Sequence, residues 1–113
     1  MLRTKGEVLR DEGSAPAERE EAMARLQQIP NVGPKRAGEL LKLGVRSLED
    51  AAGKDPEDMY YELCAIDAKR HDPCVRDVFA AVVSYANGGP ARPWWEFIPQ
   101  RKARDKARRE EVR

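Results

Sequence analysis

Hydrophobic residues recur at helical spacing through most of this chain. No window alternates apolar and polar residues long enough to predict a strand. The pattern therefore predicts an all-α fold, a compact bundle of about five short helices around one core. The clearest helical face follows Asp72-Pro73. It consists of apolar residues at positions i, i+3, i+4, i+7, i+8 and i+11, which are Val75, Val78, Phe79, Val82, Val83 and Ala86.

Capping residues and prolines set the ends of these predicted helices. Ser14 is suited to cap a helix that runs through residues 18–28, and Pro30 ends that helix. Pro34 fits the first position of a second helix, which Gly44 is placed to end. The later predicted helices cover residues 47–52, 56–64 and 73–86.

Composition divides the chain into a polar N-terminal lead-in (1–19), a globular domain (20–98) and a charged basic tail (99–113). A length of 113 residues allows one small domain. All aromatic residues lie inside the domain, between Tyr60 and Phe97. The tail has helical propensity but no apolar face with which to dock.

Charge is distributed unevenly behind a nearly neutral average. The chain has 21 Lys and Arg against 20 Asp and Glu, a formal net charge of +1. Residues 26–100 hold nine basic and eleven acidic residues, whereas residues 101–113 hold seven basic and three acidic ones. The average therefore does not exclude nucleic acid as a partner, but it limits binding to local contacts.

The chain shows no sign of export or membrane insertion. Its first residues, MLRTKGEVLR, contain no apolar run, and the longest apolar stretch, residues 79–83, is far below the ~20 residues of a membrane span. The two cysteines, Cys64 and Cys74, imply no disulfide framework. We expect a soluble cytoplasmic protein without a membrane partner.

The most specific candidate site is the string IPNVGPKRA at residues 29–37. Val32 is placed to plug the loop into the core, and Gly33 lets the backbone approach a ligand closely. The backbone N–H groups of Gly33, Lys35 and Arg36 lie at a predicted helix start, where the helix dipole favours an anion. We predict that Asn31, Val32, Gly33, Lys35 and Arg36 bind backbone phosphate and read no base.

This string resembles the helix-hairpin-helix motif, of the SAM-like type, in which a tight loop joins two helices and binds nucleic-acid backbone. That motif usually has glycine where this chain has Asn31, a residue that tolerates positive φ but whose side chain would crowd a phosphate. The resemblance implies non-catalytic, sequence-independent DNA binding. Two alternatives stay open: a protein–protein interaction module of the same fold in a DNA-repair or stress-related assembly, and a plain connector between two helices.

Further segments resemble the small bacterial pathogenicity locus family, whose members are labelled mitomycin-resistance-type or helix-hairpin-helix proteins. The resemblance covers about residues 24–97 and implies an all-helical fold of the DNA-binding type. Because a lone hairpin motif usually binds weakly, we also expect self-association or a protein partner. The segments that carry the resemblance are GVRSLED at residues 44–50, DPEDMY at 55–60, RHDPCV at 70–75 and the pair Trp94-Trp95.

Two other sets of residues could carry chemistry. Cys64, His71 and Cys74, with Asp72 as a fourth ligand, could hold zinc, but their spacing fits no standard zinc site. Asp72 is better placed to cap the helix after Pro73, so we predict no metal and no cofactor. His71 is expected instead to form a hydrogen bond that fixes the loop before the last helix of the domain.

Trp94 and Trp95 could stack on bases, but we favour a lid over the thin core, an interpretation that allows one of the pair to be partly exposed. Lys35 occupies the position of the Schiff-base lysine of helix-hairpin-helix glycosylases, with Asp50 or Asp55 as the accompanying aspartate. Those enzymes flip a base into a pocket between two lobes, which 113 residues cannot build. We therefore predict no enzymatic activity.

Overall fold

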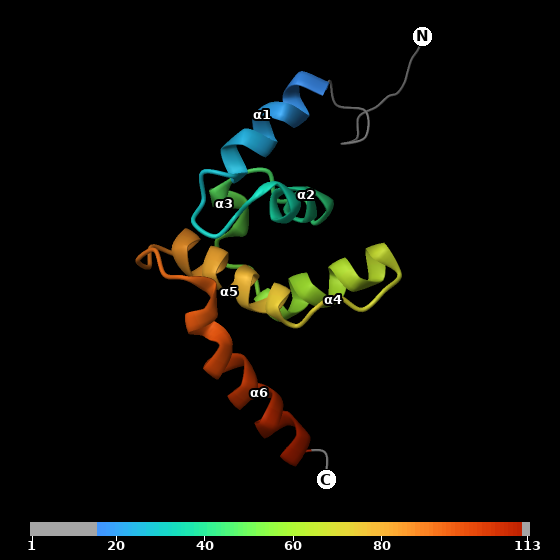
Figure 1. Cartoon of the computed structure of the whole chain (residues 1–113), viewed down its shortest axis with the longest axis vertical. Helices are drawn as coiled ribbons and strands as arrows, with labels where there is room; N and C mark the ends of the chain where they lie inside the picture. The colour runs from blue at the N-terminus through green and yellow to red at the C-terminus, as the bar shows by residue number, and fades with distance from the viewer. Residues whose placement is uncertain (1–15, 112–113) are drawn as a thin grey trace.

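The computed structural model describes residues 16–111, and every regular element in this range is helical (Figure 1). The prediction of an all-α fold is confirmed. The predicted cap Ser14 and most of the predicted lead-in lie outside the described residues. The elements are α1 (Pro16–Leu26), α2 (Pro34–Lys42), α3 (Leu48–Ala51), α4 (Pro56–Asp67), α5 (Cys74–Ala86), the 3-10 helix η3 (Trp94–Phe97) and α6 (Ile98–Glu111).

The helices begin where the caps and prolines predict. Pro34 and Pro56 occupy first helical positions, where a missing N–H costs nothing. The Asp55 carboxylate accepts the N–H of Glu57 at 2.8 Å, and Asp72 accepts the N–H of Cys74 at the same distance. These aspartates therefore cap α4 and α5, as predicted.

Helix ends follow the predicted glycines less uniformly. Gly44 follows α2 with a φ of +81°, the left-handed conformation expected after a helix. Helix α4, however, runs to Asp67, three residues past its predicted end, and stops at Ala68 with a φ of +54°. An alanine costs more in this conformation than glycine, so nothing in the sequence marked that position as a helix end.

The core forms around α5, which packs against α3, α4 and η3. Phe79 and Val82 of α5 are fully buried, as are Leu63 of α4, Leu26 of α1 and Leu40 of α2. Burying such a side chain stabilises the fold by roughly 1.5–3 kcal/mol. Leu26 and Leu40 thus bring α1 and α2 into the same core as α4 and α5.

Helix α6 contributes no buried residue. It extends from η3 at the opposite end of the long axis from α1 (Figure 1). This agrees with the absence of an apolar docking face, yet α6 still contacts α5 and η3. Among the described helices, none combines the length and apolar character needed to cross a membrane.

Candidate nucleic-acid interface

The loop between α1 and α2, residues 27–33, is anchored by two apolar side chains. Ile29 and Val32 are buried, and the N–H of Val32 donates to the carbonyl of Ile29 at 3.1 Å. Val32 therefore plugs the loop into the core, as the sequence predicts. Its side chain is unavailable to a ligand, so its part in the site is to hold the backbone in place.

Asn31 forms the turn of this loop and ties it to a distant segment. Its φ is +75°, which confirms the expected tolerance of positive φ. Its side-chain Nδ2 donates to the carbonyl of Arg92 at 2.8 Å, and its Oδ1 accepts the N–H of Trp94 at 3.1 Å. The Asn31 side chain therefore does not point at a ligand site but braces the loop from inside.

The first turn of α2 presents backbone donors that no side chain caps. Gly33 is the N-cap residue, with an extended backbone (φ −97°, ψ −170°) and no side-chain cap. The N–H groups of Lys35 and Arg36 belong to the first helical turn, which lacks intrahelical acceptors. A Cβ placed on Gly33 would meet no atom within 4 Å. The fold does not itself require glycine here, and the space beside the free amides is open.

The two predicted cations differ in their surroundings. Lys35 is exposed and forms no ion pair with any residue that the structure describes, whereas Arg36 is half-buried and paired with the nearly buried Glu39. The pKa of Asp72 is lowered, first by the N–H of Cys74 and further by the charge of Arg36. Lys35 is therefore the freer of the two positive charges beside the loop.

Cys64 and His71, two residues of the zinc alternative, form hydrogen bonds that hold the loop between α4 and α5. The N–H of His71 donates to Cys64 Sγ at 3.4 Å, and His71 Nε2 lies 2.8 Å from a carboxylate oxygen of Asp67. The Tyr60 hydroxyl donates to the carbonyl of His71. The prediction that His71 fixes this loop is confirmed. No three His, Cys, Asp or Glu side chains in the described range are grouped to hold a metal ion.

The two aspartates of the lyase alternative are both occupied as local caps. Asp50 accepts the N–H of Arg46 at 3.0 Å, and Asp55 caps α4. Neither interaction directs a carboxylate toward Lys35.

The adjacent tryptophans have different environments. Trp94 is half-buried against the core, which confirms the lid interpretation for this residue. Trp95 is 58% exposed, so it is the partly exposed member of the pair and does not cover the core. Their rings meet edge to face, with centroids 5.9 Å apart and planes at 81°.

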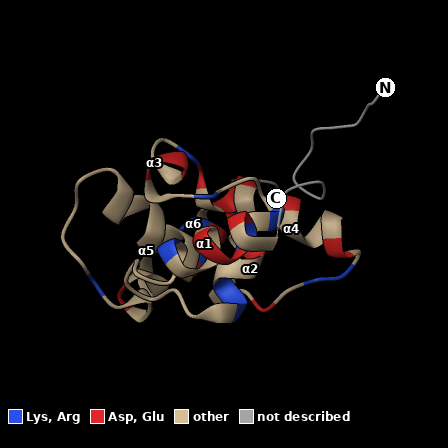
Figure 2. Cartoon of the chain, turned by 90° about the horizontal axis from the view of Figure 1, so that it is seen from above, with Lys and Arg blue, Asp and Glu red and all other residues tan. Residues whose placement is uncertain are grey.

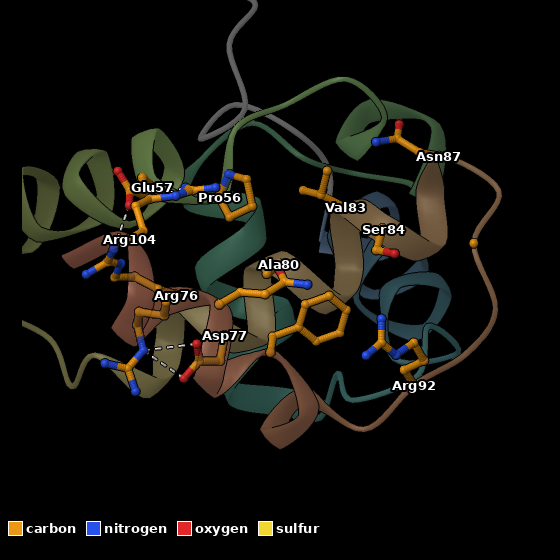
Figure 3. Close-up of a pocket in the computed structure, with 14 residues that line it drawn as sticks. Pro56, Glu57, Arg76, Asp77, Ala80, Val83, Ser84, Asn87, Arg92 and Arg104 are labelled. Atoms are coloured by element: carbon orange, nitrogen blue, oxygen red, sulfur yellow. Dashed lines mark hydrogen bonds and ion pairs between the residues drawn. The ribbon is translucent and has the colours of Figure 1, made fainter. Parts of the chain in front are cut away.

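A cluster of ion pairs, which we call the charge cluster, holds α6 against α4 and α5. Arg101 Nε lies 3.0 Å from both carboxylate oxygens of the buried Asp77. Figure 3 labels Asp77 together with Glu57, Arg76 and Arg104 of the same cluster. The other members converge on Glu57 and Asp105. Glu57 accepts from Arg76 at 2.6 Å, Arg108 at 2.7 Å and Arg104 at 3.2 Å, and Asp105 accepts from Arg76 at 3.0 Å.

Sequence reasoning missed the charge cluster because it looked for an apolar face. The signal was nevertheless present, since residues 101, 104, 105 and 108 share one face of a helix. A cavity of about 520 Å³ adjoins this cluster, with Val83, Phe97 and Arg92 in its walls.

Burial and pairing set the pKa values in the charge cluster. Burial raises the pKa of Glu57, but hydrogen bonds from Arg108 and Arg104 outweigh it and leave the value below the ordinary one. Burial raises the pKa of Asp77 above its ordinary value despite Arg101. The arginines on this face of α6 are therefore paired with acids of the domain, with Arg101 largely buried and Arg104 and Arg108 about half exposed. In the view of Figure 2, charges of both signs are interspersed over the helices.

Comparison with known proteins identifies relatives of the chain. Residues 19–103 match the family described as Pathogenicity locus. The chain is 35% identical over 77 residues to the mitomycin resistance protein McrB of Streptomyces lavendulae, a match that covers 68% of this chain and 73% of that protein. No solved structure matches the chain. The resemblance to the pathogenicity locus family is thereby confirmed.

Proposed function

This chain belongs to the pathogenicity locus family, and we propose that it is a non-catalytic protein that binds the DNA backbone without regard to base sequence. The proposal interprets α1, the loop and α2 as a helix-hairpin-helix. The observation that carries it is the open, uncapped first turn of α2, with the exposed Lys35 beside it. A phosphate would accept from the amides of Lys35 and Arg36 and pair with the Lys35 ammonium.

Gly33 supports this interpretation because it has no side chain to cap the first amides of α2. Serine, threonine, aspartate and asparagine are the preferred N-cap residues because their side chains satisfy the free amides. Gly33 leaves those amides to an external acceptor and adds no atom between them and the ligand. An incoming phosphate group would then take the place of the missing cap.

Helix α6 adds positive charge on a second face. Lys102, Lys106 and Arg109 are exposed and form no ion pair within the described residues. Their spacing places them on one side of the helix, apart from the face that carries the charge cluster. We propose that they add long-range attraction to DNA, which salt weakens.

We also propose that the protein acts in the cytoplasm and that its cellular role depends on DNA binding. The name of the Streptomyces lavendulae relative refers to mitomycin resistance, and we extend a role of that kind to this chain as part of the proposal.

The salt dependence of binding tests the proposed contact. The full chain should bind a duplex of arbitrary sequence at low salt, with log affinity falling linearly against log salt concentration. Lys35→Gln should weaken binding and flatten that slope by about 0.9, because one phosphate contact is lost. Fluorescence anisotropy with a labelled duplex measures both effects.

The matched control is Lys69→Gln. Lys69 is exposed and follows α4. The turn after α4 lies on the right of Figure 1, whereas the α1–α2 loop lies on the left. Its loss removes the same charge and should leave the slope unchanged. Equal slopes for both variants and the unaltered chain, or no binding to duplex at low salt, would contradict the proposal.

A further inference from the structure

Trp95 is the most exposed of the large apolar side chains that the structure describes. Its 58% exposure compares with 52% for Tyr61 and 48% for Ile66, both on α4. A single exposed aromatic residue is common on protein surfaces and does not make a site by itself. Unlike Tyr61 and Ile66, Trp95 directly follows a segment that is hydrogen-bonded to the α1–α2 loop.

Two hydrogen bonds join the segment before Trp95 to the proposed phosphate loop. Both use the side chain of Asn31, which bonds the carbonyl of Arg92 at 2.8 Å and the N–H of Trp94 at 3.1 Å. Trp95 follows this bridge by one residue, and Gly33 follows Asn31 by two. Consecutive Cα atoms are about 3.8 Å apart. The Cα of Trp95 therefore lies about 4 Å from that of Trp94, and the Cα of Gly33 lies at most about 8 Å from that of Asn31. In Figure 1 the two segments lie on the same side of the molecule.

The segment that carries Trp95 is also held firmly. It forms η3, and Trp94 packs against the core while meeting Trp95 edge to face. The Arg92 guanidinium lies 4.7 Å from the centre of the buried Phe97 ring and pairs with Glu96 at 2.9 Å. Because the segment is fixed and the Trp95 ring has an edge-to-face neighbour, stacking of a ligand on it costs less conformational entropy than on a ring in a loose loop.

We propose that Trp95 stacks on an unpaired base of the DNA whose backbone the Gly33–Arg36 turn binds. The bases of an intact duplex are stacked on one another, whereas single-stranded DNA leaves base faces free for an aromatic side chain. Stacking accepts any base, so it agrees with sequence-independent binding. The preferred ligand is therefore DNA with a single-stranded segment. This inference rests on the proposed function, because it takes the nearby loop to hold the phosphate.

The test compares the full chain with Trp95→Ala, Trp95→Phe and the matched control Tyr61→Ala. The probes are a labelled oligothymidine, a duplex of the same length, and a duplex with an oligothymidine flap. Trp95→Ala should bind the oligothymidine and the flap about 5- to 150-fold more weakly, with duplex affinity unchanged. Trp95→Phe should retain most of the affinity, and Tyr61→Ala should match the unaltered chain on all three probes.

Tryptophan fluorescence gives a second readout. Oligothymidine should quench the emission of the unaltered chain, and the Trp95→Phe variant should lose that quenching while it still binds. Thermal unfolding of each variant checks that the fold is kept, as the exposure of Trp95 leads us to expect.

The outcomes separate this inference from the proposed function. If all chains bind duplex and Trp95→Ala binds oligothymidine as the unaltered chain does, the stacking role is refuted and backbone binding stands. If Trp95→Ala weakens duplex binding to the same extent, Trp95 does not select unpaired bases. If the unaltered chain binds none of the probes at low salt, the proposed function itself fails.

Discussion

Position 31 must accept a positive φ and also hold two chain segments together. Glycine satisfies only the first requirement, whereas Asn31 satisfies both, because its amide donates to Arg92 and accepts from Trp94. This dual use gives a reason for asparagine at this position of the chain, whether or not a ligand binds the loop. The residue is better described as a brace than as a phosphate ligand.

Two substitutions at this position separate the two requirements. Asn31→Ala should destabilise the protein by about 2–4 kcal/mol, because it loses both hydrogen bonds and strains the backbone. Asn31→Gly loses the hydrogen bonds but not the backbone freedom and should cost about 1–3 kcal/mol. Urea unfolding followed by circular dichroism measures both values. The reverse order, or an unchanged midpoint for both variants, would show that the brace does not stabilise the fold.

At the level of elements, α6 is attached to the domain by charge rather than by apolar contact. Glu57 accepts hydrogen bonds from three arginines, two of them on α6. The carboxylate must be ionised to hold them. The docking of α6 therefore depends on the protonation state of this cluster.

Glu57→Gln should loosen α6 without unfolding the domain. The loss of a charge-assisted bond costs about 1.5–3 kcal/mol, so amides of α6 should exchange with solvent about tenfold faster or more. Glu62→Gln, on the exposed side of the same helix, is the matched control. Equal protection of α6 in both variants would contradict the ionic docking.

Acid should have the same effect as Glu57→Gln. Because the folded pKa of Glu57 is lowered, its stabilising contribution is present above the ordinary value of 4.5 and is lost as the pH falls through the lower folded value. The hydrogen bond from Arg76 likewise lowers the pKa of Asp105, so acid also removes the stabilising contribution of this carboxylate. The raised pKa of Asp77 opposes them. The protection of α6 amides, measured relative to their intrinsic exchange rate at each pH, should therefore fall in the unaltered chain as the pH drops below the ordinary value of 4.5.

The elements differ in how well sequence predicts them. Helix starts were predictable because Pro34, Asp55 and Asp72 act on their own neighbours. The end of α4 was not, because Ala68 adopts a left-handed conformation that its side chain does not favour. The docking of α6 was missed because helical apolar periodicity carries no information about arginines that pair with acids on other helices.

At the scale of the whole molecule, the net charge of +1 combines charges paired between helices with cations that form no ion pair in the described range. The arginines on the inner face of α6 neutralise acids of α4 and α5, while Lys35 and the outer cations of α6 stay exposed. The loop of the candidate site could be predicted because its residues are contiguous. Its connection to Trp95 could not, because Asn31 and Trp94 lie far apart in the sequence and meet only in the fold.

The most direct measurement of the central claim is an NMR titration of the full, isotope-labelled chain with a short duplex at low salt. Binding of backbone phosphate at the start of α2 predicts that the amide signals of Gly33, Lys35 and Arg36 shift most, because those N–H groups would donate to the ligand. Raising the salt concentration should reverse the shifts. Unmoved signals at these three residues, with shifts gathered instead on α4 around Tyr61 and Ile66, would contradict the account.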